Sequence, residues 1–401
     1  MRTESFSQMA SPDVTTFDKS SAAFPGIENR VLLAACSASP LPAVALARMA
    51  EQAQLQAAVG GLAFEAYDGL LTQLRAAAGQ LLGADAGDIS FQRNSTEAIS
   101  LIAAGYPFSS GDEVIGYVHE YPANHYPWRN LAQHGVRLVE LANSRPPGVA
   151  DCGSRPCAFS LDELEQRITP RTRVVALSHV QFASGYAVDV RALAALCHER
   201  GIDLVIDAAQ SLGALPIEPL PGMAAIVASG WKWLLGPIGS GVMWTSPQLR
   251  EKVRHVIVGA ESMQQGTDYL DHSWRPHSSA KRFEYATSSP TLVAGLEASI
   301  DSIHLRYGVA AINTELLRLQ DLLIDRLDDA LFTPLRFDPV HRSGILAVIC
   351  RRREPAQLEA ALRERGFITT VRGGYLRVAP HFFVTDEQVE RLAETMNACG
   401  R

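Results

Sequence analysis

The sequence predicts an α/β fold, with a mostly parallel sheet covered on both faces by helices and a smaller α+β unit after it. Between Ile89 and Trp244, short runs rich in Val, Ile and Leu alternate with amphipathic helical patterns. This alternation is typical of buried parallel strands joined by crossover helices. A sheet of this kind binds its ligands at the carboxyl ends of its strands.

The elements follow one another in a regular order. Helices are predicted at 43–58 and 64–82, before the alternating region. Within it, strands are predicted at 112–118, 136–141, 173–180 and 202–207, and helices at 124–135, 160–168 and 189–201. Long helices follow at 290–308 and 312–329. The smaller unit has strands at 344–350, 367–371 and 375–379 and helices at 355–366 and 385–397.

Composition excludes several classes of protein. The 401 residues are 47% hydrophobic and 20% charged, with a net charge of -7, which is typical of a globular protein. The absence of a dense Lys/Arg block argues against nucleic acid and anionic membranes as partners. The apolar stretch from Pro219 to Trp244 contains Lys232 and is interrupted by Gly and Pro, so it predicts a buried strand–loop–strand instead of a membrane span.

The cysteines and the N-terminus predict a cytoplasmic protein. No apolar segment of a secretory signal stands at the N-terminus. The six cysteines are scattered without a CxxC pair, as expected for reduced thiols. Cys152 and Cys157 share the loop "DCGSRPC", where a local disulfide or a metal site is the alternative.

Lys232 stands alone in the apolar stretch "SGWKWLLGP". Burial of an ammonium group lowers its pKa, and the neutral amine can form a Schiff base with an aldehyde. The alternative is a lysine whose stem is buried and whose amine reaches water. Ser229 and Lys232 also have the spacing of a serine acylase motif, but "LLGPIGSG" cannot continue the helix that this motif requires.

Three further signals are weak when taken singly. Asp207 ends a predicted buried strand and is suited to holding a pyridine nitrogen protonated, or to capping a turn. Asn94, Ser95 and Thr96 precede a helix, with Glu97 completing a possible capping box, and this is a phosphate cradle or a plain N-cap. Arg377 lies on a late strand, where it would bind a carboxylate or lie on the surface.

Together these signals occur in the order of a known family. From about Val31 to its end the chain resembles the class V aminotransferase group of fold-type I pyridoxal phosphate enzymes. That group includes cysteine desulfurases, kynureninase, isopenicillin N epimerase-like proteins and ergothioneine-type C–S lyases. The motifs that carry the resemblance are "RNSTEA", "EYPANHYPW", "DAAQSLGALPI", "SGWKWLLGPIGSG", "RFEYAT" and "LRVAPHF".

The resemblance implies an architecture and a cofactor. It implies a seven-stranded sheet in a large pyridoxal 5'-phosphate-binding domain at 31–289. An N-terminal arm at 1–30 would precede this domain, and a small C-terminal domain would follow at 290–401. It also implies a homodimer whose two subunits share their active sites.

The resemblance also implies a role for each matched residue. Lys232 would form the Schiff base and shuttle the proton at Cα. The cofactor would be held by Ser95, Thr96, Tyr121, Asp207, Gln210, Ser229, Trp231 and Lys232, and by Thr287 of a neighbouring subunit. Arg377 would bind the substrate carboxylate.

Three departures from the family bear on the reaction. Trp231 precedes the lysine where the family usually has His or Tyr, and Phe182 stands where desulfurases have Asn. The segment "RGFITTVRGGYLR" has no cysteine where a desulfurase has its nucleophile, so we expect another reaction. Our first expectation is β-elimination from an S-substituted cysteine conjugate in specialised metabolism. Transamination, epimerisation and decarboxylation are the alternatives.

Other classes of protein are disfavoured by missing motifs. The chain has no G-x-G-x-x-G after a first strand, no H-E-x-x-H and no G-x-S-x-G, which argues against nicotinamide enzymes, metal hydrolases and α/β-hydrolases. A scaffold that merely keeps the fold would need neither Lys232 nor Asp207. The segment with His272, Trp274 and His277 would line a pocket for a bulky substrate, or form a dimer contact.

Overall fold

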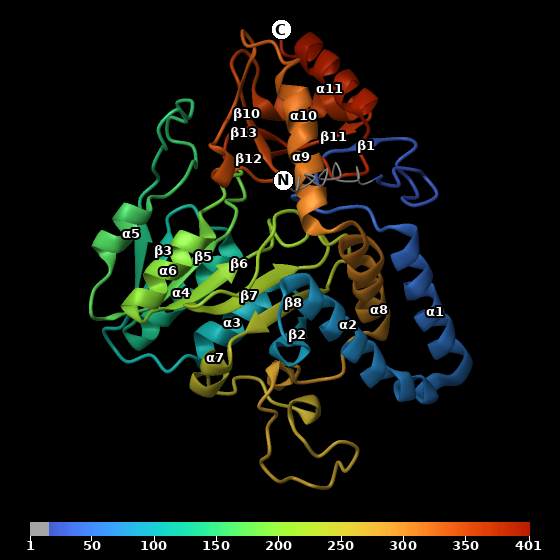
Figure 1. Ribbon diagram of the computed structural model, residues 1–401, viewed down its shortest axis with the longest axis vertical. Coiled ribbons are helices and arrows are strands. Elements are labelled where there is room, and N and C mark those ends of the chain that lie inside the picture. The colour runs from blue at the N-terminus through green and yellow to red at the C-terminus, as the bar shows by residue number, and fades with distance from the viewer. Residues whose placement is uncertain (1–15) are drawn as a thin grey trace, which may run out of the picture.

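The structure, a computed structural model, describes residues 16–401, so the first half of the predicted N-terminal arm lies outside the described residues. Its centre is a seven-stranded sheet in the order β2-β8-β7-β6-β5-β3-β4 (Figure 1). The strands are β2 Ile89–Gln92, β3 Glu113–Tyr117, β4 Arg137–Leu141, β5 Thr172–Ser178, β6 Asp203–Asp207, β7 Met223–Ser229 and β8 Gly241–Thr245. Strands β3 to β7 pair in parallel with their neighbours, whereas β8 is antiparallel to β7 and β2. The predicted mostly parallel sheet is confirmed.

Helices cover both faces of this sheet. Alternate residues of β5 divide between two apolar clusters, with Val175 and Leu177 in one and Val174 and Ala176 in the other. The first face is covered by α2 Tyr67–Leu82, α5 Leu161–Arg167, α6 Val190–Arg200 and α8 Pro290–Ser299, and the second by α3 Ser95–Gly105, α4 Tyr126–Asn130 and α7 Pro247–Lys252. Burial on both faces explains why the strands are continuous runs of Val, Ile and Leu.

The order of the strands places a ligand site at one edge. From β3 the chain moves outward to β4 and then returns to the other side of β3 as β5, continuing to β6 and β7. The strand order therefore reverses between β3 and β5. Ligands of open α/β sheets bind in the crevice at such a switch point, beyond the carboxyl ends of the strands.

The C-terminal part forms a second sheet with its own helices. Strands β12 Thr370–Arg372, β13 Tyr375–Val378, β10 Leu346–Cys350 and β9 Phe332–Pro334 pair antiparallel in that order. They are accompanied by α9 Val309–Ile324, α10 Pro355–Glu364 and α11 Asp386–Cys399 (Figure 1). β1, Val31–Leu32, pairs in parallel with β11, Phe367–Ile368. The segment at the predicted start of the large domain thus packs on the C-terminal part.

Two predicted helices differ in detail. The segment Gly60–Ala66 before α2 is 3-10 helix, and α1 spans Ala43–Val59. The predicted helix at 124–135 is divided into 3-10 turns at Pro122–Asn124 and Leu131–His134 with α4 between them. Pro122 and Pro127 explain the division, because a proline lacks the N–H that an inner helical turn requires.

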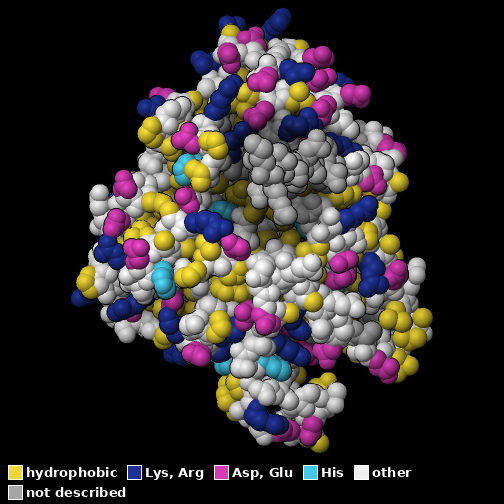
Figure 2. All heavy atoms as spheres, viewed as in Figure 1, with side chains coloured by type: hydrophobic (Ala, Val, Ile, Leu, Met, Phe, Trp, Pro, Cys, Tyr) yellow, Lys and Arg dark blue, Asp and Glu magenta, His cyan; other side chains and the backbone are white. Residues whose placement is uncertain are grey.

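One segment projects away from the body of the protein. Residues Val256–Ser279, here called the projecting segment, extend beyond the sheet opposite the C-terminal part (Figure 1). Its surface is a mixture of apolar and charged side chains (Figure 2). Within residues 16–401, no helix has the length and apolar character needed to cross a bilayer.

Candidate active site

Lys232 lies in a loop whose backbone is bound on several sides. In the Lys232 loop, Ser229–Pro237, the carbonyl oxygen of Trp231 accepts from the Ser39 amide at 2.9 Å. The Trp233 carbonyl accepts from Nε2 of His304 at 2.8 Å, and the Leu235 carbonyl from Oγ of Ser299 at 2.9 Å. Contacts from such distant parts of the chain hold the loop in one conformation.

The loop also contains local strain. Leu235 has φ of 56°, in the left-handed region that residues with a Cβ avoid. At Gly230 a Cβ would come within 2.6 Å of Ser240 Oγ, so this position has room only for glycine. Strain of this kind persists only where surrounding contacts over-determine it, and it concentrates at functional sites.

Lys232 and Asp207 influence one another electrostatically. Burial lowers the pKa of the Lys232 amine, and the negative charge of Asp207 opposes this shift. Burial raises the pKa of Asp207, and the Lys232 charge opposes that shift in turn. The carboxylate of Asp207, 3% exposed at the end of β6, accepts the Ala209 amide at 2.9 Å through Oδ1. Within residues 16–401 no donor to its Oδ2 is found, so this oxygen could bind a ligand N–H.

A pair of serine hydroxyls marks the expected phosphate position. Ser95 Oγ, in the first turn of α3, lies 2.9 Å from Ser229 Oγ at the end of β7. Thr96 is the next residue of the same turn and is exposed. Because the first amides of a helix lack partners within it, they attract an anion to this position.

The predicted capping box is present only in part. Asn94 accepts the Glu97 amide through its side chain at 2.9 Å, which is one half of the box. The Glu97 carboxylate accepts the Arg93 amide at 2.9 Å, instead of the amide of the cap residue Asn94.

Aromatic side chains and Arg377 lie around the lysine. The Lys232 amine is 5.4 Å from the centre of the Tyr121 ring, which meets the Phe182 ring edge to face at 5.3 Å. Arg377 is 2% exposed and donates from Nε to Thr370 Oγ1 at 3.1 Å and from Nη1 to the carbonyl of Phe182. Its positive charge contributes to the lowered pKa of Lys232. Among residues 16–401, Nη2 of Arg377 has no hydrogen-bond partner, so it could donate to a substrate carboxylate.

The side-chain amide of Gln210 makes two hydrogen bonds within the chain. Its amide oxygen accepts from Trp233 Nε1 at 3.1 Å, and its Nε2 donates to the Cys36 carbonyl at 2.9 Å. One N–H of Gln210 thus remains for the ring hydroxyl that the resemblance assigns to it. Trp231, expected near the phosphate, is half-buried and joins this loop through its carbonyl.

Thr287 does not join the Lys232 site within the chain. It is exposed and lines a surface pocket with Tyr67, His277 and Lys281. The chain near it is anchored by Glu284, which pairs with Arg75 and accepts the Phe91 amide at 2.9 Å. His272 and Trp274 lie on the projecting segment, and Trp274 is 67% exposed.

Sequence reasoning missed two groups at this site. Cys36, 2% exposed, has its thiol 3.8 Å from Thr370 Oγ1, the hydroxyl that also accepts from Nε of Arg377. Glu120 follows β3 at the switch point and accepts the Ser178 amide at 2.7 Å. Burial raises the pKa of Glu120 to about 7, helped by the nearby charge of Asp207. The motif "EYPANHYPW" contained Glu120, but its burial depends on β5 and β6.

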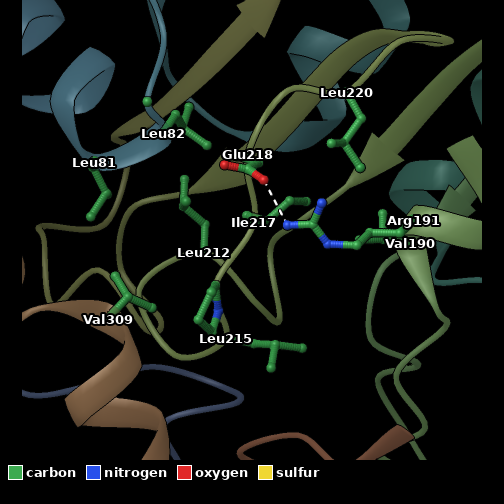
Figure 3. Close-up of a pocket in the computed structure, with 12 residues that line it drawn as sticks. Leu81, Leu82, Val190, Arg191, Leu212, Leu215, Ile217, Glu218, Leu220 and Val309 are labelled. Carbon is green, nitrogen blue, oxygen red and sulfur yellow. Dashed lines mark hydrogen bonds and ion pairs between the residues drawn. The ribbon is translucent and has the colours of Figure 1, made fainter. Parts of the chain in front are cut away.

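A separate apolar pocket lies on the side of the sheet covered by α2. Its walls are formed by Leu81, Leu82, Leu212, Leu215, Ile217 and Val309 (Figure 3). Among the described residues that line it, the charged ones are Arg191 and Glu218, which pair with each other at 2.7 Å. The pocket shares no residue with the Lys232 site and has no free catalytic group among its lining residues.

Comparison with known proteins identifies the family. The model of the family described as Aminotransferase class-V matches residues 31–389. The chain belongs to the class V aminotransferase family. A probable cysteine desulfurase of Methanothermobacter thermautotrophicus is 25% identical over 394 residues, covering 93% of this chain and 95% of the relative. Isopenicillin N epimerase of Streptomyces clavuligerus is 27% identical, covering 90% and 93%.

Solved structures show the same fold. C-DES with glycine covalently linked to its PLP cofactor superposes with a TM-score of 0.85 at 20% identity, covering 94% of this chain and 99% of that one. The cystine C-S lyase C-DES in complex with cysteine persulfide gives a TM-score of 0.84 at 21% identity, covering 93% and 99%. The chain has the fold of class V enzymes, and its cofactor is pyridoxal 5'-phosphate.

The residues present fit this cofactor. A half-buried lysine with a lowered pKa can bind an aldehyde, and a buried carboxylate with a free oxygen can hold a pyridine N–H. The hydroxyls of Ser95 and Ser229 can donate to a phosphate at the start of α3. The Tyr121 ring near Lys232 can cover an electron-poor ring.

Proposed function

We propose that this class V enzyme cleaves the C–S bond of an S-substituted cysteine by β-elimination, with Lys232 as the residue that holds the cofactor. The observation that carries the proposal is the segment Phe367–Arg377. It folds as β11, β12 and β13, with its turn at Gly373 and Gly374, and contains no cysteine. A reaction that needs no protein nucleophile at this position suits such a segment best.

In this reaction the protein's own groups bind, orient and move a proton. When bound, pyridoxal phosphate withdraws electrons from the substrate Cα. Asp207 supports this by keeping a negative charge at the pyridine nitrogen. The Lys232 amine takes the proton from Cα, and burial lowers its pKa, which favours the neutral amine that acts as a base. Loss of the sulfur substituent from Cβ then needs no further acid if the leaving group is a thiolate.

Arg377 provides the orientation in this proposal. Its two bonds, to Thr370 and to the Phe182 carbonyl, fix the guanidinium plane. A substrate carboxylate on the remaining nitrogen would direct the Cα–H bond with respect to the cofactor. Orientation decides which bond at Cα breaks, so this contact is the one that selects deprotonation over loss of the carboxylate.

Relatives support a neighbouring set of reactions. The proteins similar to this chain are named cysteine desulfurase and isopenicillin N epimerase, and one similar structure is named a cystine C-S lyase. The second candidate is therefore desulfuration of cysteine. The observation favouring it is Cys36, whose thiol lies 3.8 Å from Thr370 Oγ1, the hydroxyl that Arg377 also contacts.

Product analysis tests the proposal. The purified enzyme is incubated with S-alkyl cysteines and with free cysteine, and pyruvate, ammonia, alanine and sulfide are measured. We expect pyruvate, ammonia and the thiol from S-alkyl cysteine, together with a visible absorption band that is absent in Lys232→Ala. A keto acid with an intact side chain would indicate transamination. Alanine formed from cysteine, and abolished in Cys36→Ser, would indicate desulfuration.

We also propose that the enzyme is a homodimer with shared active sites. The projecting segment exposes Tyr269, Leu270 and Trp274 at 65%, 88% and 67%, and large apolar groups exposed together are typical of interfaces. Thr287 follows this segment and would reach the phosphate of the second subunit. Light scattering during size-exclusion chromatography is expected to give twice the monomer mass, and a monomeric mass would contradict the proposal.

A further inference from the structure

The loop Ala142–Ser160, here called the dithiol loop, brings two cysteine thiols into contact. Cys152 Sγ lies 3.1 Å from Cys157 Sγ, and the two residues are 2% and 1% exposed. A disulfide bond is about 2.05 Å long, so bond formation requires an approach of about 1 Å. Within residues 16–401 no group of three metal-binding side chains includes this pair, which argues against a metal site.

The dithiol loop is held by two anchors outside it. On one side, Ser184 Oγ donates to the Cys157 carbonyl. On the other, Tyr375 OH donates to the Pro156 carbonyl at 2.9 Å, and Arg155 Nε donates to the Gly374 carbonyl at 3.1 Å. The first anchor follows β5 in the large sheet, and the second belongs to the β12–β13 hairpin of the C-terminal part.

These two anchors flank the contact that fixes Arg377. Arg377 donates to the Phe182 carbonyl. Phe182 is two residues before Ser184, and Arg377 is two residues after Tyr375 on β13. Side chains two residues apart on a strand point to the same face. The dithiol loop is therefore connected to both partners of the Arg377–Phe182 contact through two residues of backbone on each side.

We propose that Cys152 and Cys157 form a thiol–disulfide couple whose oxidation state adjusts the position of Arg377. The Cys152 thiolate attacks a low-molecular-weight disulfide and releases one thiolate, leaving a mixed disulfide. Cys157 loses its proton and attacks Cys152 Sγ, which releases the second thiol. Two protein thiols are oxidised to one disulfide, and the small disulfide is reduced by two electrons to two thiols.

The environment of the pair supports this order of attack. The neighbouring Cys157 thiol lowers the pKa of the Cys152 thiol more than burial raises it, and the Tyr375 hydroxyl adds to the lowering. The pKa of Cys157 is raised, as expected of the thiol that keeps its proton. Asp151, Gly153 and Ser154 beside Cys152 are exposed, so a small opening of the dithiol loop gives an oxidant access.

Mass spectrometry of the full-length holoenzyme tests the couple without reference to activity. The protein is equilibrated in mixtures of glutathione and glutathione disulfide, quenched with acid, denatured and alkylated. We expect two fewer alkylations under oxidising conditions and a peptide joined through positions 152 and 157. Cys157→Ser is expected to retain glutathione on Cys152, because the second attack is lost. Cys197→Ser is the matched control and should behave as the wild type.

Two results would overturn the couple. One is full alkylation of positions 152 and 157 in the most oxidising mixture. The other is a glutathione adduct on Cys152 that persists in the wild type without an internal disulfide. If Cys157→Ser is unstable, Cys152→Ser gives the same decision, because it should form neither the disulfide nor the adduct.

The effect on Arg377 rests on the proposed function and is measured separately. Reduced and oxidised wild type are compared with an amino-acid substrate, with Cys152→Ser in both buffers as control. We expect KM to differ by about fivefold or more between the two forms, with kcat changed much less. Equal KM values with a proven disulfide would refute the connection to Arg377 and leave the proposed reaction untouched.

Discussion

The Lys232 loop and the projecting segment are built in opposite ways. In the Lys232 loop, three carbonyl groups accept hydrogen bonds from Ser39, Ser299 and the imidazole of His304, all far away in sequence. The projecting segment is held by local bonds, such as Gln264 N to the Arg275 carbonyl at 2.8 Å. The conformation of the Lys232 loop therefore depends on distant parts of the chain. The projecting segment, in contrast, exposes apolar side chains and is bonded mainly to itself.

This difference separates two kinds of prediction. Changes at Asp207 and Arg377 should alter chemistry and leave assembly intact, because the contacts that hold these two side chains lie within one chain. Changes at the projecting segment should alter assembly first and chemistry only as a consequence. A variant at the Lys232 site that changes assembly, or a variant in the projecting segment that changes chemistry in the intact dimer, would contradict this expectation.

The largest effect is expected from Asp207→Asn. An amide keeps the shape of the side chain but removes the negative charge beside the pyridine nitrogen. Loss of one preorganised electrostatic group reduces kcat by about 100- to 1,000-fold, and we expect a decrease in this range. Steady-state kinetics checks it, with dimer mass unchanged. Asp203→Asn, at the opposite end of the same strand, is the control and should keep most activity; an equal loss there would point to damage of β6.

The next effect is expected from Arg377→Ala. Charge-assisted hydrogen bonds contribute about 1.5–3 kcal/mol each, which corresponds to an increase in KM of about 10- to 160-fold. Arg377→Lys should recover only part of this loss, because an ammonium lacks the planar fork of the guanidinium. Arg372→Ala, at the exposed end of the neighbouring strand β12, is the control. A decrease in kcat with unchanged KM would contradict the assignment to the carboxylate.

A smaller effect on activity is expected from Leu270→Glu in the projecting segment. A glutamate at this 88% exposed position places a charge in the proposed interface, which should weaken dimerisation about tenfold or more. Activity should fall only at low protein concentration. Sedimentation velocity across a dilution series measures the dissociation. Val340→Glu, exposed on the C-terminal part, should change nothing; equal dimer masses for both variants would place the interface elsewhere.

The sequence predicted those parts of the molecule that depend on neighbours along the chain. The parallel sheet followed from runs of apolar residues, because both faces of each strand are buried. Lys232 stands out as a candidate because no charge lies near it in sequence, and Asp207 because it ends a strand. The resemblance to the family assigns Ser95 and Ser229 to the phosphate, and their hydroxyls are 2.9 Å apart.

What sequence could not give is contact across long separations. The Arg377 bond to Phe182 spans 195 residues, and the Cys36 thiol meets Thr370 across 334. The 3.1 Å approach of Cys152 and Cys157 depends on how a loop without regular structure folds onto Tyr375. Neither periodicity nor spacing determines such packing, since it is set by the relative placement of the two sheets.

The smallest effect is expected from Glu120→Gln, and it concerns how the free energy of unfolding depends on pH. Because the pKa of Glu120 is raised to about 7 from 4.5, the folded protein keeps a proton that the unfolded chain has released between these values. The unfolded state binds fewer protons there, so the free energy of unfolding decreases as pH rises from about 4.5 to 7. Because glutamine cannot ionise, Glu120→Gln does not lose this part of the free energy of unfolding as pH rises.

Urea unfolding measures the free energy of unfolding at pH 5 and at pH 8. Between these pH values it should decrease by about 1–2 kcal/mol less in Glu120→Gln than in the wild type. Asp268→Asn, exposed on the projecting segment, should keep the wild-type difference. Equal pH dependence in Glu120→Gln and the wild type would mean that water reaches Glu120 at the switch point.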